Sequence, residues 1–161
     1  MTRLPRVLGA LAVVAVLAAA WFGWGWWQAA TDAGLVRARD RDAVVAAAGE
    51  ALVTLNTIDY RDGPAAIDRW IAVTSGQLGS SLNGDRQTQQ DRAKTAQLVA
   101  TASLRQIAVT ELTGDTARVI AVLDVSIATG GGAPKPGRSH VIADVSRVEG
   151  TWKVTSVQAA T

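Results

Sequence analysis

The sequence predicts an α+β protein in which one transmembrane helix precedes a domain of about three helices packed on a curved four-stranded antiparallel sheet. An uncharged apolar run over residues 7–27 indicates the membrane helix. Apolar residues then recur at spacings of three and four over residues 35–59, which is typical of a helix. From about residue 95 they alternate with a period of two, which is typical of strands. The predicted parts are a cytoplasmic cap and anchor (1–28), a linker (29–34) and an exported domain (35–161).

The apolar run is long enough to cross a bilayer. With ~1.5 Å of rise per residue, a helix of this length would span roughly 30 Å. Basic residues precede the run and aromatic residues close it, a distribution typical of a span whose N-terminus stays in the cytoplasm. The predicted anchor and interface residues are Arg3, Arg6, Trp21, Trp24, Trp26 and Trp27. We therefore expect a single-pass protein of the inner cell membrane with an extracytoplasmic C-terminal domain.

A cleavable signal peptide is the alternative interpretation of the same run. Residues 18–20 provide an Ala-x-Ala pattern behind an apolar segment. Cleavage after Ala20 would leave an apolar, aromatic N-terminus exposed to water, so the anchor is favoured. Both interpretations export the domain.

Composition excludes several classes of function. Arg3 and Arg6 account for the formal net charge of +2, so the exported part is formally neutral and carries no basic stripe for nucleic acid. The chain has no cysteine and one histidine, which leaves no disulfide framework and no plausible metal cluster. The sequence therefore predicts no catalytic, cofactor-binding or metal-binding residue.

Helices are expected in the first half of the domain. The first ends before the breaker at residues 62–64, where Pro64 can occupy the first turn of a short second helix over residues 65–73. Gly76 is a candidate left-handed cap for that helix. A third helix is expected over residues 77–94, interrupted near Asn83 and Gly84.

Four strands follow. The apolar phase changes between Leu104 and Ile107, which predicts a β-bulge near Arg105 and Gln106. A turn is expected at residues 113–115 and a glycine-rich hairpin tip at 130–137. The remaining predicted strands cover residues 117–127, 139–148 and 152–157. Because an antiparallel sheet must bury one face, the helices are expected to cover it.

This order of elements, together with the closing segment EGTWKVTSV (149–157), resembles the nuclear transport factor 2-like superfamily, whose domains are cone-shaped. More narrowly, the chain resembles actinobacterial Mce-associated membrane proteins in four pieces: the anchor, the segment LNTIDYRD (55–62), Thr74-Ser75-Gly76 and the two closing hairpins. The resemblance implies a non-enzymatic accessory protein that stabilises or regulates an Mce-type lipid transport complex. Its partners would be Mce subunits and the membrane, with lipid as a further candidate.

Two other functions stay open. Inner-membrane assembly factors of type IV secretion or conjugation systems also join one helix to a similar exported domain. A ligand-binding or enzymatic cone could use His140 and Asp124 as an acid–base pair, although both residues lie off the apolar phase of their strands, which favours exposure. The large aromatic residues of the domain are predicted to fill the core or to line a pocket or partner contact: Tyr60, Trp70 and Trp152.

Overall fold

The computed structural model describes residues 19, 21 and 33–160. The chain forms two compact units, residues 1–40 and 41–161. Of the predicted anchor residues, only Trp21 is described, and it is helical and 81% exposed. No helix among the described residues is long and apolar enough to cross a membrane. The predicted span as a whole, the candidate cleavage position at Ala20 and the other anchor residues (Arg3, Arg6, Trp24, Trp26 and Trp27) lie outside the described residues.

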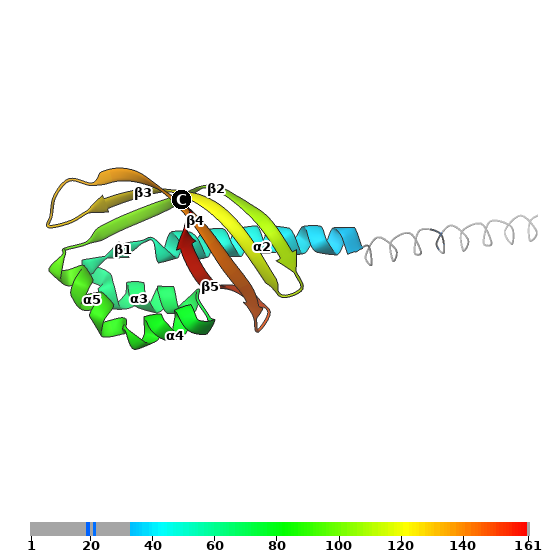
Figure 1. Ribbon diagram of the computed structural model, residues 1–161, viewed down its shortest axis with the longest axis horizontal. Coiled ribbons are helices and arrows are strands. Elements are labelled where there is room, and N and C mark those ends of the chain that lie inside the picture. Colours follow the sequence, from blue (N-terminus) through cyan, green and yellow to red (C-terminus); the bar gives the residue numbers. More distant parts are fainter. Residues whose placement is uncertain (1–18, 20, 22–32, 161) are drawn as a thin grey trace, which may run out of the picture. The chain divides into compact units, whose positions relative to one another are not determined.

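The prediction of an α+β fold is confirmed (Figure 1). The helices are α2 (Ala33–Leu55), the 3-10 helix η1 (Tyr60–Asp62), α3 (Gly63–Ala72), α4 (Gly76–Gly84) and α5 (Arg86–Thr95). The strands are β1 (Ile58–Asp59), β2 (Val99–Thr113), β3 (Thr116–Ala128), β4 (Lys135–Val148) and β5 (Thr151–Ala159). They form one antiparallel sheet in the order β1-β2-β3-β4-β5.

Several boundaries differ from the sequence prediction. The sheet has five strands rather than four, because residues 58–59 leave the first helix and pair with β2 as β1. The Asn56 side chain, which donates to Leu52 O at 2.8 Å, helps to end α2 before that strand. The interruption predicted near Asn83 and Gly84 in the third helix is present, because the structure divides this helix at Asp85 into α4 and α5. β4 begins at Lys135, inside the predicted hairpin tip, because residues 135–137 pair with β3.

The main core lies between α2 and the inner face of the sheet. Val44, Ala48 and Leu52 of α2 are at most 1% exposed and belong to one cluster with buried side chains of β3, β4 and β5. The period of four residues places these three side chains on one stripe of the helix. In residues 41–160, the helices lie on the concave side of the sheet, and the other face is left open (Figure 1).

The predicted bulge in β2 is present. The pairing of β2 with β3 shifts between Leu104 and Gln106, so that Arg105 is the extra residue. A second, unpredicted shift lies between Val109 and Glu111. Bulges bend a strand and increase its twist, so the two shifts contribute to the curvature of the sheet.

A smaller core lies beneath the β1 edge of the sheet. It contains Ile58, Ala66, Ile67 and Ala93, with Tyr60, Trp70, Ile71, Leu98 and Ala100 packed around them. At the opposite edge, Thr74 forms a bridge with Val154 of β5, where Ser75 N donates to Val154 O at 2.9 Å. The segment after α3 is thereby tied to the last strand.

Candidate functional site

The interior of the cone is filled by side chains. Val119 and Leu123 of β3 and Val145 of β4 point to the inner face and are at most 1% exposed. They belong to the same cluster as the apolar stripe of α2. The centre of the inner face is therefore hydrophobic core, and candidate sites for contact lie elsewhere.

The three predicted pocket or partner residues lie in two different places. Trp152 belongs to the main core, is 7% exposed, and has the Arg147 guanidinium 4.8 Å from its ring centroid. Trp70 and Tyr60 border the smaller core. Tyr60 carries the Arg61 guanidinium 5.0 Å from its ring centroid. The structure therefore places Trp70 and Tyr60 at the same core and Trp152 in another, and their contact with a partner stays a prediction.

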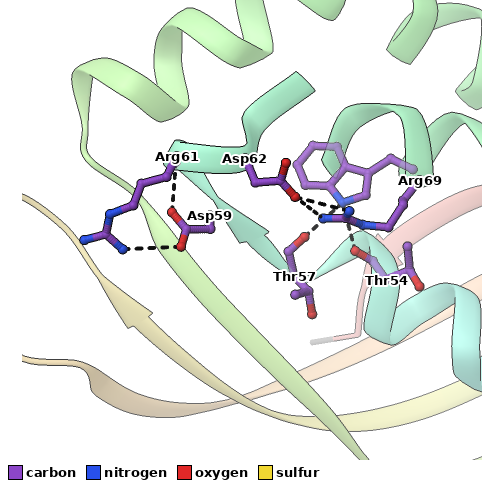
Figure 2. Close-up of polar contacts among 7 residues, drawn as sticks. Thr54, Thr57, Asp59, Arg61, Asp62 and Arg69 are labelled. Atoms are coloured by element: carbon purple, nitrogen blue, oxygen red, sulfur yellow. Dashed lines mark hydrogen bonds and ion pairs between the residues drawn. The ribbon is translucent and has the colours of Figure 1, made fainter. Parts of the chain in front are cut away.

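Trp70 joins α3 to the end of α2. Its Nε1 donates to Thr54 O at 2.8 Å and to Thr57 O at 3.2 Å, as Figure 2 shows. These carbonyls lie in and just after the last turn of α2, where a helix leaves carbonyl groups without partners in the helix itself. The indole thus gives these carbonyls a donor, beside the Thr57 N that also donates to Thr54 O at 3.1 Å, and ties α3 to the end of α2.

Two ion pairs flank this junction (Figure 2). Arg69 Nη1 and Nη2 both donate to Asp62 Oδ2 at 3.3 Å. Arg61 donates its backbone N to Asp59 Oδ1 at 2.9 Å and its Nη1 to Asp59 Oδ2 at 3.4 Å. All four side chains are substantially exposed, so these pairs orient the turn around η1 more than they stabilise it.

The outer face of the sheet, opposite α2, is an exposed surface on which apolar and charged side chains follow a regular order. Its middle is apolar, and Ile120 there is 41% exposed. Strand pairing places Ala108, Ile120 and Ile142 side by side on β2, β3 and β4, with Val122 in the next position along β3. We call these four residues the apolar centre.

A row of charged side chains crosses the strands on each side of the apolar centre. The first, the Arg118 row, contains Glu111, Arg118 and Asp144, and Arg118 Nε lies 2.7 Å from Asp144 Oδ1. The second, the Asp124 row, contains Arg105, Asp124 and Arg138. Asp124 accepts from Arg105 Nη1 at 3.1 Å and from Arg138 Nε at 3.3 Å. The bulge at Arg105 is what lets this side chain reach β3.

These contacts change the pKa values of the groups. The hydrogen bond from Arg105 is the largest cause of the lowered pKa of Asp124; desolvation opposes it, and the hydrogen bond from Arg138 lowers the pKa further. Hydrogen bonds from Arg118 and Ser156 lower the pKa of Asp144, and the Asp144 carboxylate raises the pKa of Arg118. Both carboxyl groups are therefore ionised near neutral pH and are poorly suited to donate a proton.

The predicted acid–base pair of His140 and Asp124 is not formed inside the cone. His140 lies on the outer face, exposed and opposite Val122, and the Asp124 carboxylate is bonded to two arginines. Alternation on β3 and β4 directs both side chains away from the core. No group of three or more metal-ligating side chains occurs within residues 33–160.

Two shallow depressions coincide with the charged rows. One of about 520 Å³ is bordered by Ser103, Asp124 and Arg138, and one of about 360 Å³ is bordered by Glu111, Arg118 and Asp144. Sites for small molecules are usually enclosed, whereas these depressions are open and each has charged side chains at its border beside apolar ones. The outer face therefore has the character of a contact surface.

No family model and no curated protein matches the chain. Its fold is similar to that of several solved structures. An IcmL-like type IV secretion system protein from Legionella pneumophila matches with a TM-score of 0.61 and 14% identity over 74% of this chain and 91% of that one. The periplasmic domain of DotI matches with a TM-score of 0.61 and 15% identity, covering 74% and 94% of the two chains. CagV from Helicobacter pylori, a VirB8 homologue of a type IV secretion system, matches with 0.58 and 10%, covering 74% and 97%.

Proposed function

We propose that this chain is a non-catalytic assembly factor of an envelope-spanning protein machine, and specifically of a type IV secretion or conjugation system. Residues 7–27 would hold it in the inner membrane, and residues 35–161 would form an extracytoplasmic contact module. This is the second function that the sequence left open, and it now has better support than the Mce-associated one.

The observation that carries the proposal is the packed interior of the cone. Val119, Leu123 and Val145 occupy, with α2, the space in which a ligand-binding cone would hold its ligand. Recognition would then be left to exposed surfaces, as expected of an assembly protein. The fold similarity to the secretion system proteins named above adds support from a second direction.

A role beside an Mce-type lipid importer is the second candidate. It rests on the sequence resemblance in residues 55–62 and 74–76 and in the two closing hairpins. Both candidates need the same anchor and the same kind of contact module, so they differ in the partner alone.

Affinity capture in mild detergent separates the candidates. The full-length tagged chain is purified from its native host, and bound proteins are identified by mass spectrometry. A tagged chain of residues 1–34 serves as the control, because it keeps the predicted anchor and linker and lacks the domain. We expect secretion or conjugation components with the full chain and not with the control.

The other results are equally informative. Recovery of Mce subunits or their permease would replace the first candidate by the second. Recovery of the same proteins by residues 1–34 would show that the domain is not the contact module. Recovery of the tagged protein alone would overturn both candidates.

A further inference from the structure

The charges of the outer face have a regular order of sign. From β2 to β4, the Arg118 row is negative, positive, negative, and the Asp124 row is positive, negative, positive. The two rows lie at equal distances from the middle of the face, because Arg118 and Asp124 stand three residues before and after Ala121. Each row is therefore the electrostatic complement of the other.

We propose that the outer face binds a second copy of this chain, face to face. The twofold axis lies between the two sheets, parallel to their planes and perpendicular to the strands, and passes over β3 near Ala121. This inference goes beyond the proposed function and does not depend on it. Homodimers with twofold symmetry use the same patch on both copies, so the patch must complement itself. The outer face meets that requirement in the charges of its two rows, and its apolar centre lies at the axis between them.

The proposed axis exchanges the two rows. Arg118 of one copy then lies over Asp124 of the other, and Asp144 lies over Arg138. Glu111 lies over Ser103, beside the Arg105 guanidinium that reaches Asp124. By symmetry each contact occurs twice, so the charges on β3 and β4 face opposite charges directly and Glu111 lies close to one. A twofold axis parallel to the strands would instead place Arg118 over Arg118 and Glu111 over Asp144. Like charges in direct opposition are unfavourable, so the charge pattern selects the perpendicular axis.

The apolar centre fits the same arrangement. Ile120 of one copy lies over Val122 of the other, and Ile142 lies over His140. Ile120 is 41% exposed in the single chain, so pairing would remove apolar surface from water. Stacked sheets keep their strands within about 30° of each other, which the antiparallel overlay of β3 on β3 permits.

The size of the surface sets the strength of the pair. With strands ~4.8 Å apart and ~3.3 Å per residue, the face between and including the rows covers on the order of 300–400 Å² per copy. Stable complexes bury about 800 Å² per partner, so the pair is weak in solution. Copies held in one membrane would meet at a higher effective concentration. A test must therefore capture a transient contact.

Cross-linking in the full-length chain provides that capture. The protein contains no cysteine, so Ile120→Cys introduces a single reactive thiol in the apolar centre. In the proposed pair, the two introduced thiols lie near the axis and within reach of a short bismaleimide. We expect a covalent dimer in mild detergent. Thr88→Cys, on exposed α5, is the position control and should give none.

Charge reversal then tests the register. In the Ile120→Cys background, Arg118→Glu alone should lower the yield of dimer about tenfold, because it creates two like-charge contacts with Asp124. Asp124→Arg alone should do the same by facing Arg118. When the two variants carry different tags and are mixed, every row contact is again between opposite charges. The mixture should restore the yield and give the heterodimer.

A charge-reversal control and a check of folding accompany the test. Arg69→Glu reverses a charge in an exposed ion pair away from the outer face and should leave the yield unchanged. Circular dichroism of each variant checks that it folds, and restoration on mixing cannot come from an unfolded chain. Absence of a dimer in the Ile120→Cys protein would overturn the proposal. A yield that is insensitive to Arg118→Glu, or no recovery in the mixture, would overturn the proposed register.

Discussion

Hydrogen bonds made by single polar atoms determine how several residues stabilise this domain. The Trp70 indole is partly buried, and its Nε1 is the donor that serves two carbonyls at the end of α2. Arg118 and Asp144 are exposed enough to be solvated, yet each shifts the pKa of the other in the direction that favours its charged form. Stability at the residue scale thus depends on hydrogen-bond donors at particular positions.

Replacement of Trp70 by Phe tests the indole contact. An aromatic ring is retained, whereas Thr57 O loses the indole donor and Thr54 O keeps the hydrogen bond from Thr57 N. We expect a loss of about 1 kcal/mol in the free energy of unfolding, the usual net value of such a bond. Urea denaturation of the detergent-solubilised chain measures it. A variant as stable as the wild type would mean that water serves the carbonyls equally well.

The lowered pKa of Asp144 predicts a stability change in acid. A carboxyl group whose pKa is lower in the folded state stabilises the fold above its unfolded value, and this contribution is lost as the pH falls through the folded value. The ordinary value is 3.8, so the loss belongs below about pH 4. We expect Asp144→Asn to flatten the dependence of the urea midpoint on pH in this range.

Arg118→Gln provides the matched variant for that experiment, because it removes the first cause of the lowered Asp144 pKa. It should flatten the same range, and the double variant should add little to either single one. Additive effects would show that the two side chains act independently.

At the scale of residues, the sequence predicted exposure better than partnership. Asp124 and His140 were expected on the solvated phase of their strands, and both lie on the outer face. The arginine partners of Asp124 were not foreseen, because they depend on the pairing of three strands and on the bulge at Arg105. The off-phase charges of β3 and β4 were the available signal.

Turns and bulges determine how the elements meet. The β4–β5 hairpin turns through Glu149 and Gly150, whose φ angles are 51° and 79°. Two-residue loops with positive φ at both central positions match the twist of a hairpin, and Asn-Gly is favoured there. Glu149 therefore adopts the left-handed backbone conformation, which Asn and Gly tolerate better than Glu.

Substitution of Glu149 by Asn should stabilise this hairpin. Asn tolerates the left-handed region more readily than Glu, so we expect a gain of about 0.5–1 kcal/mol. The converse variant, Gly150→Ala, should cost a similar amount or more because Ala is strained at this φ. Thermal unfolding of both proteins compares them, and a neutral Glu149→Asn variant would show that the turn stores no strain.

Elements with a local signal were predictable, and those made by tertiary pairing were not. The phase change around Arg105 revealed the first bulge, and Pro64 lies at the start of α3 as expected. β1 is only two residues long, which is too short for any periodicity, and it exists because β2 offers it a partner. The start of β4 was missed because its Gly and Pro residues are poor strand formers by themselves.

For the molecule as a whole, the two cores indicate unequal local stability. β3 lies between two long neighbours and buries Val119, Ala121 and Leu123. In contrast, none of residues 76–84 in α4 is buried, and α5 buries Ala93. The change of hydrophobic period in the sequence predicted helices packed on a sheet. The difference in local stability between β3 and the helices α4 and α5 was not predictable, because it depends on which helices reach the core.

Amide hydrogen exchange should report that gradient. We expect the amides of β3 to exchange most slowly, by way of global unfolding, and those of α4 and α5 to exchange much faster through local opening. Mass spectrometry of peptides from the full-length chain measures both regions in one sample. Equal protection of α4 and β3 would contradict the prediction and indicate a single cooperative unit.

The two bulges of β2 also bear on the solubility of a protein whose copies would be crowded at a membrane. Only Val99 and Ala100 of this strand pair with β1, so most of its outer edge presents backbone groups that another chain could extend into a continuous sheet. The irregular backbone at Arg105 and near Val109 interrupts that edge, and Arg41 Nη2 already occupies Val109 O at 3.0 Å. A strand added from a neighbouring molecule would find no long stretch of regularly spaced donors and acceptors, so the bulges disfavour polymerisation through this edge.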